Sequence, residues 1–199
     1  NPPPAAPFAV LHAYFRRQLP AASAEQLTAI EALFEPRLLA RHEVLVRADE
    51  VARVGAFVAR GCLRSFVVDA KGKEHIIQFA PENWWISDQN SLSRQEPAQF
   101  SIDAVEDSEV LLFDATFFRQ LSQLTPAFTE FFHRLLQNNV RTLQRRLVLT
   151  LSASAEQRYV DFGQTYPTLA RRLPQRMIAS YLGVTPESLS RIRRELAGH

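Results

Sequence analysis

The spacing of apolar residues predicts strands in the first two-thirds of the chain and helices around them. Between about residues 37 and 113, short runs rich in Val, Ile and Phe alternate with turn residues, a pattern typical of β-strands. The runs cover residues 54–61, 62–69, 74–80, 99–105 and 108–114. Many short strands at close spacing predict an all-β barrel or roll. Gly72, in the loop between the second and third runs, is expected at positive φ in a hairpin.

Helical spacing precedes this region. Residues 8–19 and 23–35 are predicted to be helical, and Ser23 with Gln26 forms a plausible capping box at the start of the second helix. Residues 1–7 contain three consecutive prolines and show no periodicity, so they are expected to be a disordered or extended lead-in.

A long amphipathic helix is predicted from Pro126 to Leu151. Its apolar residues recur at steps of three and four, which draws one stripe along a helix roughly 37 Å long. The stripe is longer than one small domain can cover, so a dimer seam is the preferred interpretation, and packing on the chain's own β-roll is the alternative. The predicted seam residues are Phe128, Phe132, Leu136, Val140, Leu143 and Leu147.

The last third contains a local motif in residues 174–196. Pro174 suits the first position of a helix, and Gly183 suits the left-handed residue that ends it. Thr185 then caps a second helix whose first residue is Pro186. A helix, a three-residue turn with glycine and a capped second helix together predict a helix-turn-helix.

The outward face of the second helix, 186–196, carries the groups expected to read DNA. A glutamate can accept a hydrogen bond from cytosine N4, and an arginine can bind guanine O6 and N7, when such a helix lies in the major groove. Other arginines nearby are placed where phosphates would run. The candidate DNA-binding residues are Arg171, Arg172, Gln175, Arg176, Thr185, Glu187, Ser188, Ser190, Arg191 and Arg194.

The charge distribution supports this interpretation. The net charge of the 199 residues is only +2, but residues 134–199 carry 11 Arg and 4 acidic residues, so their net charge is +7. Residues 1–133 have a net charge of −5. Arginine suits phosphate contacts and bidentate base recognition, so the back third is predicted to bind a polyanion. A solvated helix surface is the alternative that charge alone leaves open.

Composition argues against several other classes of protein. The single cysteine, Cys62, cannot form an internal disulfide or a cysteine-based zinc or iron–sulfur site, which fits a cytoplasmic protein. No apolar run reaches the roughly 18 residues of a membrane helix. His42 and His75 are isolated, so no metal site is expected. No glycine-rich phosphate loop or nucleophile motif occurs, so an enzyme is not expected.

These features together resemble the Crp/Fnr family of bacterial transcription regulators. The stretches 59–85 and 102–114 look like that family's cyclic-nucleotide-binding fold, and residues 178–196 look like its helix-turn-helix. The resemblance implies an α+β chain in four parts: a lead-in at 1–7, a β-roll of the double-stranded β-helix type at 8–125, a dimerisation helix at 126–151 and a helix-turn-helix domain at 152–199. It also implies a homodimer that binds palindromic double-stranded DNA and contacts RNA polymerase.

The expected effector pocket departs from the family pattern. Family members that bind cyclic nucleotides use a Gly-Glu pair for the ribose and an Arg-(Ser/Thr)-Ala-(Ser/Thr) segment for the phosphate. Aligned on those motifs, the chain has Pro81-Glu82, and Glu96 stands at the arginine position. A carboxylate would repel the cyclic phosphate, and Pro97 lacks an N–H to donate. Cyclic AMP is therefore not expected, no cofactor is predicted and the effector is unknown; the candidate pocket residues are Glu82, Trp84, Trp85, Arg94, Glu96, Pro97, Ala98 and Gln99.

Two functions from different classes remain at this stage. The preferred one is a homodimeric DNA-binding regulator whose roll has lost or changed its effector. The alternative is a sensor of a cyclic nucleotide or other small ligand whose helical tail binds a protein. The basic face of residues 187–194 favours DNA.

Overall fold

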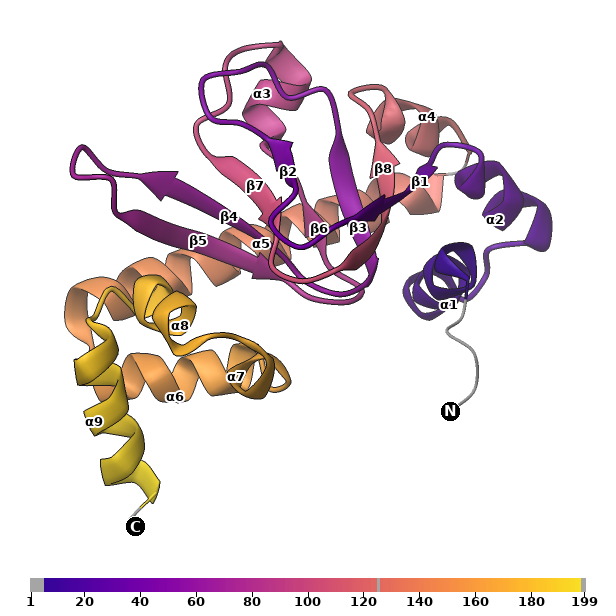
Figure 1. The fold of residues 1–199 in the computed structure, drawn as a ribbon. Helices are drawn as coiled ribbons and strands as arrows, with labels where there is room; N and C mark the ends of the chain where they lie inside the picture. Colours follow the sequence, from indigo (N-terminus) through magenta and orange to yellow (C-terminus); the bar gives the residue numbers. More distant parts are fainter. Residues whose placement is uncertain (1–5, 125, 198–199) are drawn as a thin grey trace. The chain divides into compact units, whose positions relative to one another are not determined.

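The computed structural model describes residues 6–124 and 126–197, and it divides the chain into two compact units. Unit 1 comprises residues 1–67 and 78–135, and unit 2 comprises residues 68–77 and 136–199. The division falls inside the long helix and assigns the tip of one β-hairpin to unit 2 (Figure 1). The lead-in predicted at 1–7 lies largely outside the described residues, and its last residue, Pro7, begins the first helix.

Helices and strands occur in the order that the sequence pattern predicts, with strands in the middle and helices at both ends (Figure 1). The helices are α1 (Pro7–Gln18), α2 (Ala24–Glu31), α3 (Gln89–Arg94), α4 (Phe117–Leu124), α5 (Pro126–Ser152), α6 (Ala155–Thr165), α7 (Leu169–Arg172), α8 (Gln175–Leu182) and α9 (Pro186–Ala197). The strands are β1 (Glu35–Leu39), β2 (Val44–Val46), β3 (Gly55–Arg60), β4 (Leu63–Val68), β5 (Glu74–Ala80), β6 (Trp85–Ile86), β7 (Ser101–Ala104) and β8 (Ser108–Phe113).

The strands form two four-stranded sheets, in the orders β1-β8-β3-β6 and β2-β7-β4-β5. Both sheets contribute to one buried cluster, which includes Ala56 and Val110 from the first sheet and Leu63 and Ile102 from the second. Because side chains alternate across a strand, β3, β7 and β8 each contribute two residues that are two positions apart: Ala56 and Val58, Ile102 and Ala104, and Val110 and Leu112. The β-roll predicted from the sequence is confirmed.

The other face of the first sheet is covered by helices. Phe57, Leu111 and Phe113 alternate with the roll-core residues and pack into a second cluster with side chains of α1, α2, α4 and the start of α5. Trp85 lies among these rings, and its indole N–H donates to the Tyr14 hydroxyl at 3.0 Å. Buried tryptophan and tyrosine usually need such a partner for their polar ends. This aromatic cluster fixes the N-terminal helices on the roll.

Unit 2 has its own small core, formed by α6 to α9. Its buried residues include Phe162 from α6, Leu169 from α7, Ile178 from α8 and Ile192 from α9. A capping box between Ser154 and Gln157 starts α6, with both reciprocal hydrogen bonds present. Among the helices of residues 6–124 and 126–197, none is both long and apolar enough to cross a membrane.

Most predicted elements are confirmed, and the differences have local causes. The Ser23–Gln26 capping box is present, and Gly72 has a φ of 77°. The helix predicted at 23–35 was too long, because α2 ends at Glu31 and the chain pairs from Glu35 onward with β8 in an antiparallel register. Long-range pairing therefore overrides the helical spacing of the last residues.

Candidate nucleic-acid interface and effector pocket

The last two helices form a pair joined by a three-residue turn. Gly183 ends α8 with φ 67°, and the Val184 N–H donates to the Ala179 carbonyl at 3.0 Å. This left-handed ending turns the chain and satisfies the last carbonyls of α8. The Thr185 hydroxyl then accepts from the Ser188 N–H at 3.2 Å, which caps α9 as the sequence predicts. At the other end, Pro174 is the N-cap of α8, one position before the one predicted.

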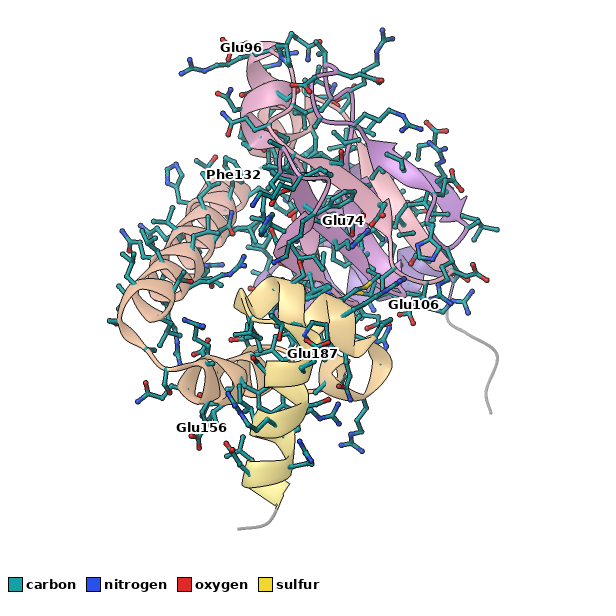
Figure 2. All side chains as sticks on the ribbon, turned by 60° about the vertical axis from the view of Figure 1, so that its left-hand side comes forward. Glu74, Glu96, Glu106, Phe132, Glu156 and Glu187 are labelled. Atoms are coloured by element: carbon teal, nitrogen blue, oxygen red, sulfur yellow. The ribbon has the colours of Figure 1, made fainter. Side chains whose placement is uncertain are left out.

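The two faces of α9 differ in chemistry. Leu189 and Ile192 are buried against the core of unit 2. The polar residues between them point away from that core, and Figure 2 labels Glu187 at the N-terminal end of the helix. The exposed predicted DNA-binding residues of α8, the turn and α9 are Gln175, Arg176, Thr185, Glu187, Ser190, Arg191 and Arg194, and Ser188 is half-buried.

Two contacts organise this exposed face. The pKa of the Glu187 carboxyl lies below its usual value because its own backbone N–H and the Thr185 hydroxyl hydrogen bond to it. The carboxyl is therefore an ionised hydrogen-bond acceptor near neutral pH. The Ser190 hydroxyl donates to the Gln175 side-chain carbonyl at 3.2 Å, so α8 and α9 are joined on the same face. These contacts hold the Glu187 carboxylate and the Gln175 amide on the exposed side of the helix pair.

The predicted phosphate contacts lie on the two helices that precede α9. Arg171 and Arg172 occupy the last turn of α7, where both are exposed. Arg176 lies in the first turn of α8 and is exposed too. The structure thus assigns all ten predicted DNA-binding residues to one unit, unit 2.

The backbone N–H groups of the predicted phosphate loop in the roll donate hydrogen bonds within the chain. The Ala98 N–H donates to the Glu50 carbonyl at 2.8 Å, and the Gln99 N–H donates to an Asp88 carboxylate oxygen at 2.8 Å. Pro97 has no N–H and pairs in an isolated bridge with Val51. Three successive residues of the loop therefore have no backbone donor left for an anion.

Asp88 is a residue of this region that the sequence analysis missed. It is 3% exposed, and its other carboxylate oxygen accepts from the Ser91 N–H at 3.0 Å as the N-cap of α3. The Ser91 hydroxyl in turn donates to the Glu96 carbonyl at 2.6 Å and accepts from the Ala52 N–H. The signal that could have identified it is an aspartate directly before the short polar segment that forms α3.

The other predicted pocket residues have structural partners of their own. Glu82 accepts from the Gly61 N–H at 3.0 Å, and Glu96 accepts from the Asn90 amide at 3.0 Å. Figure 2 labels Glu96 just beyond the end of α3, and Arg94 is exposed in the last turn of the same helix. Trp84 packs against the roll core, and Trp85 belongs to the aromatic cluster. That these residues line one effector pocket therefore stays a prediction.

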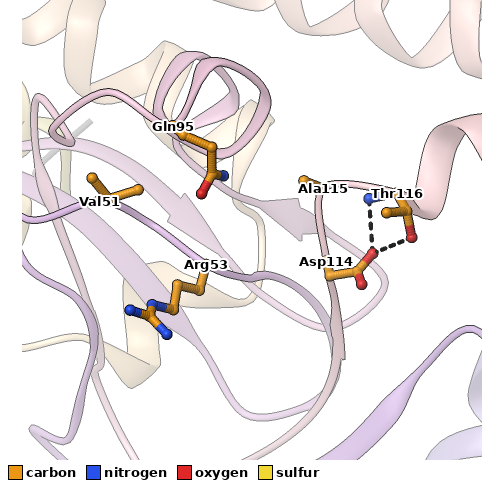
Figure 3. Close-up of a pocket in the computed structure, with 6 residues that line it drawn as sticks. All are labelled: Val51, Arg53, Gln95, Asp114, Ala115 and Thr116. Carbon is orange, nitrogen blue, oxygen red and sulfur yellow. Dashed lines mark hydrogen bonds between the residues drawn. The ribbon is translucent and has the colours of Figure 1, made fainter.

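An open depression on unit 1 borders the segment of residues 94–97. It has a volume of about 490 Å³ and is lined by Val51, Arg53, Gln95, Asp114, Ala115 and Thr116 (Figure 3). The Asp114 carboxylate accepts from the Thr116 N–H at 2.8 Å and from its hydroxyl at 2.7 Å. These contacts lower the pKa of Asp114, with the Thr116 hydroxyl as the main cause. The carboxylate thus serves the turn that leads into α4.

The predicted seam residues fall into two groups along α5. Phe128 is 1% exposed in the aromatic cluster, and Phe132 stacks on Phe118 with ring centres 4.0 Å apart, so these two pack on the roll of their own chain. For Phe128 the seam prediction was wrong, because this residue is buried in the aromatic cluster of its own chain. Phe132 is half-buried against Phe118 of α4, so its place in a seam stays a prediction. Four apolar side chains further along are more than a third exposed: Leu136, Val140, Leu143 and Leu147.

Comparison with known proteins agrees with this architecture. Residues 36–124 match the family model described as the cyclic nucleotide-binding domain. FixK2 from Bradyrhizobium japonicum has a similar structure, with a TM-score of 0.70 and 19% identity over 83% of this chain and 85% of that one. A regulator of the Crp/Fnr family from Eubacterium rectale has a TM-score of 0.67 and 14% identity over 93% and 88% of the two chains. The chain has the Crp/Fnr fold.

Another protein of this fold has a TM-score and a sequence identity in the same range. The c-di-GMP-responsive regulator CLP from Xanthomonas campestris has a TM-score of 0.69 and 12% identity over 88% of this chain and 92% of that one. Comparison of the sequence with curated proteins finds no match. The similarity therefore establishes the fold, and the residues described above have to carry the function.

Proposed function

We propose that the protein is a homodimeric transcription regulator that binds palindromic double-stranded DNA and, once bound, contacts RNA polymerase. In this proposal α8 and α9 are a helix-turn-helix, and α9 is the recognition helix. The observation that carries the proposal is the outward face of α9, where exposed Glu187, Ser190 and Arg191 surround a capped helix start. Such a helix start reaches base edges when it enters the major groove.

The charges of unit 2 support DNA as the polyanion. Arg171, Arg172 and Arg176 are exposed on α7 and α8, the helices that precede the recognition helix, and in this proposal they bind phosphates and set its register. The ionised Glu187 in the same unit disfavours a purely non-specific role, because a carboxylate repels phosphates but accepts from cytosine N4. Sequence-specific reading explains why an acid is tolerated in a basic surface.

Dimerisation is the second part of the proposal. Leu136, Val140, Leu143 and Leu147 follow one stripe of α5 and are left partly exposed by their own chain. A two-fold axis along this stripe would bury them against the same residues of a second copy. It would also present two recognition helices to the two halves of a palindrome.

The proposed sensor does not use cyclic AMP in the ordinary way. The loop of residues 96–99 has a carboxylate at Glu96 and keeps the N–H groups of Ala98 and Gln99 in internal hydrogen bonds. Binding a cyclic phosphate there would require breaking those bonds against charge repulsion. CLP, which is described as c-di-GMP responsive, is an example of a protein of this fold with a different effector.

Salt-dependent binding to duplex DNA tests the proposal. Each phosphate neutralised contributes about 0.9 to the slope of log affinity against log salt, so about 6–10 contacts predict a slope between about −5 and −9. A slope near zero, or no binding to a random duplex library at low salt, would contradict the DNA-binding function and favour a protein partner for the helical unit.

A further inference from the structure

Arg146 binds three backbone carbonyl groups from two other segments of unit 2. One guanidinium nitrogen donates to the Ile76 carbonyl at 2.7 Å and to the Tyr181 carbonyl at 2.9 Å, and the other donates to the Ile77 carbonyl. The guanidinium carbon also lies 4.0 Å from the centre of the Tyr181 ring. Arg146 is half-buried, and this burial lowers the pKa of its guanidinium.

Ser180 completes the same junction. Its hydroxyl accepts from the Ile76 N–H at 3.1 Å and donates to the Glu74 carbonyl at 2.7 Å. Glu74 and Ile76 belong to β5, which is the last strand of its sheet. An edge strand presents unpaired backbone groups that must find partners. Here a serine and an arginine from the helices supply them, so the tip of the β4–β5 hairpin is bonded to both α5 and α8.

The junction of Arg146 and Ser180 with β5 lies directly before the turn of residues 183–185, which sets the direction of α9. Ser180 and Tyr181 are in the last turn of α8, three and two residues before Gly183, respectively. Tyr181 also packs against Phe162 and Tyr166 of the unit 2 core, with ring centres 5.4 and 5.7 Å away. Restraining this turn of α8 therefore restrains the direction in which the chain leaves Gly183.

We propose that Arg146 is a positioning residue for DNA recognition, which holds the C-terminal turn of α8, and through it α9, by bridging Tyr181 to the edge of β5. The hairpin tip at residues 68–77 is then a structural part of the DNA-reading unit. This inference rests on the proposed DNA-binding function. It predicts that loss of the bridge lowers specific binding more than it lowers non-specific binding.

The test compares Arg146→Gln with Arg141→Gln in the full chain. Arg141 lies on the same helix, is exposed and donates to the Asn138 side chain three residues away, so its substitution removes the same charge outside the junction. Each variant is measured on the duplex selected by the unmodified protein and on a scrambled duplex at one salt concentration. Arg146→Gln is expected to weaken specific binding by at least about tenfold relative to Arg141→Gln, with equal affinities for the scrambled duplex.

Amide hydrogen exchange provides a readout without DNA. The Ile76 amide, which donates to Ser180, should exchange at least about tenfold faster in Arg146→Gln and in Ser180→Ala than in Arg141→Gln. Arg146→Lys, which keeps the charge but lacks the planar fork, should give an intermediate rate and serves if Arg146→Gln does not fold.

The outcomes separate the two proposals. Unchanged exchange at Ile76 in Arg146→Gln overturns the positioning role, whatever the DNA results are. Faster exchange with an unchanged ratio of specific to non-specific affinity overturns it as well, because the junction would then be structural only. If the unmodified protein binds no duplex, the DNA-binding function fails, and with it the role of Arg146 in recognition.

Discussion

Replacing Leu143 with arginine tests the proposed dimer. Leu143 is 45% exposed in the single chain, at the centre of the stripe on α5. Fully burying a leucine contributes about 1.5–3 kcal/mol, so covering the exposed part contributes about 0.7–1.4 kcal/mol in each protomer. Because a two-fold interface uses each residue twice, loss of this apolar contact alone weakens the dimer by about 1.4–2.7 kcal/mol, or roughly ten- to a hundredfold.

The arginine adds a larger effect. Two guanidinium groups would be brought together near the axis, where each loses water and repels the other, at a cost of several kcal/mol. We therefore expect Leu143→Arg to be a monomer at micromolar concentration and to lose specific DNA binding at the same time. Thr142→Arg places the same charge on the adjacent, exposed position of the helix and should leave the dimer intact.

Sedimentation velocity at several micromolar measures both variants and the unmodified chain, and the same samples are then titrated with DNA. The reasoning is refuted if the unmodified chain is already monomeric, or if Leu143→Arg sediments as a dimer. If Leu143→Arg is monomeric but still binds the selected duplex with unchanged affinity, dimerisation is not what organises recognition.

Three further changes have defined outcomes. Arg172→Ala, a predicted phosphate contact, should weaken binding to all duplexes alike, and a change confined to one sequence would reassign it to base reading. Cyclic AMP or cyclic GMP at about 1 mM should leave the melting temperature unchanged, whereas a ligand at a hundredfold excess over Kd would add about 2.7 kcal/mol of stability. Asp103→Ala should lower the free energy of unfolding by about 3–5 kcal/mol, because it leaves the buried Arg64 without its bidentate carboxylate, while Asp107→Ala at an exposed site serves as the control in the same denaturant titration.

The elements whose apolar residues recur at a regular spacing could be predicted from the sequence. The five apolar runs and the stripe of α5 are recognisable because their periodicity depends only on residues that are close in sequence. Strands β2 and β6 have only three and two residues, too few to show any period, and α3 depends on its Asp88 cap more than on an apolar face. The two strands exist because pairing with β7 and β3, which are distant in sequence, holds them.

The same distinction applies to the sites. The α8–α9 pair could be predicted because its glycine, its cap and its apolar face are adjacent in sequence. The contacts of Asp88 with Gln99 and of Arg146 with Ile76 join residues 11 and 70 positions apart. Phe128 and Phe132 share the helical spacing of the exposed leucines, so only the position of the sheet beneath them separates the two groups. Spacing alone therefore identifies a face of a helix without saying what covers it.

Selection of binding sites from a random duplex library tests the central claim most directly. The unmodified protein should enrich one palindromic sequence whose half-sites are centred about 34 Å, or one helical turn, apart. Glu187→Ala should still select that palindrome but relax one position of each half-site, at a cost of about 1–3 kcal/mol for the preferred base. Enrichment of no sequence by the unmodified protein, or an unchanged preference in Glu187→Ala, would contradict sequence reading by α9.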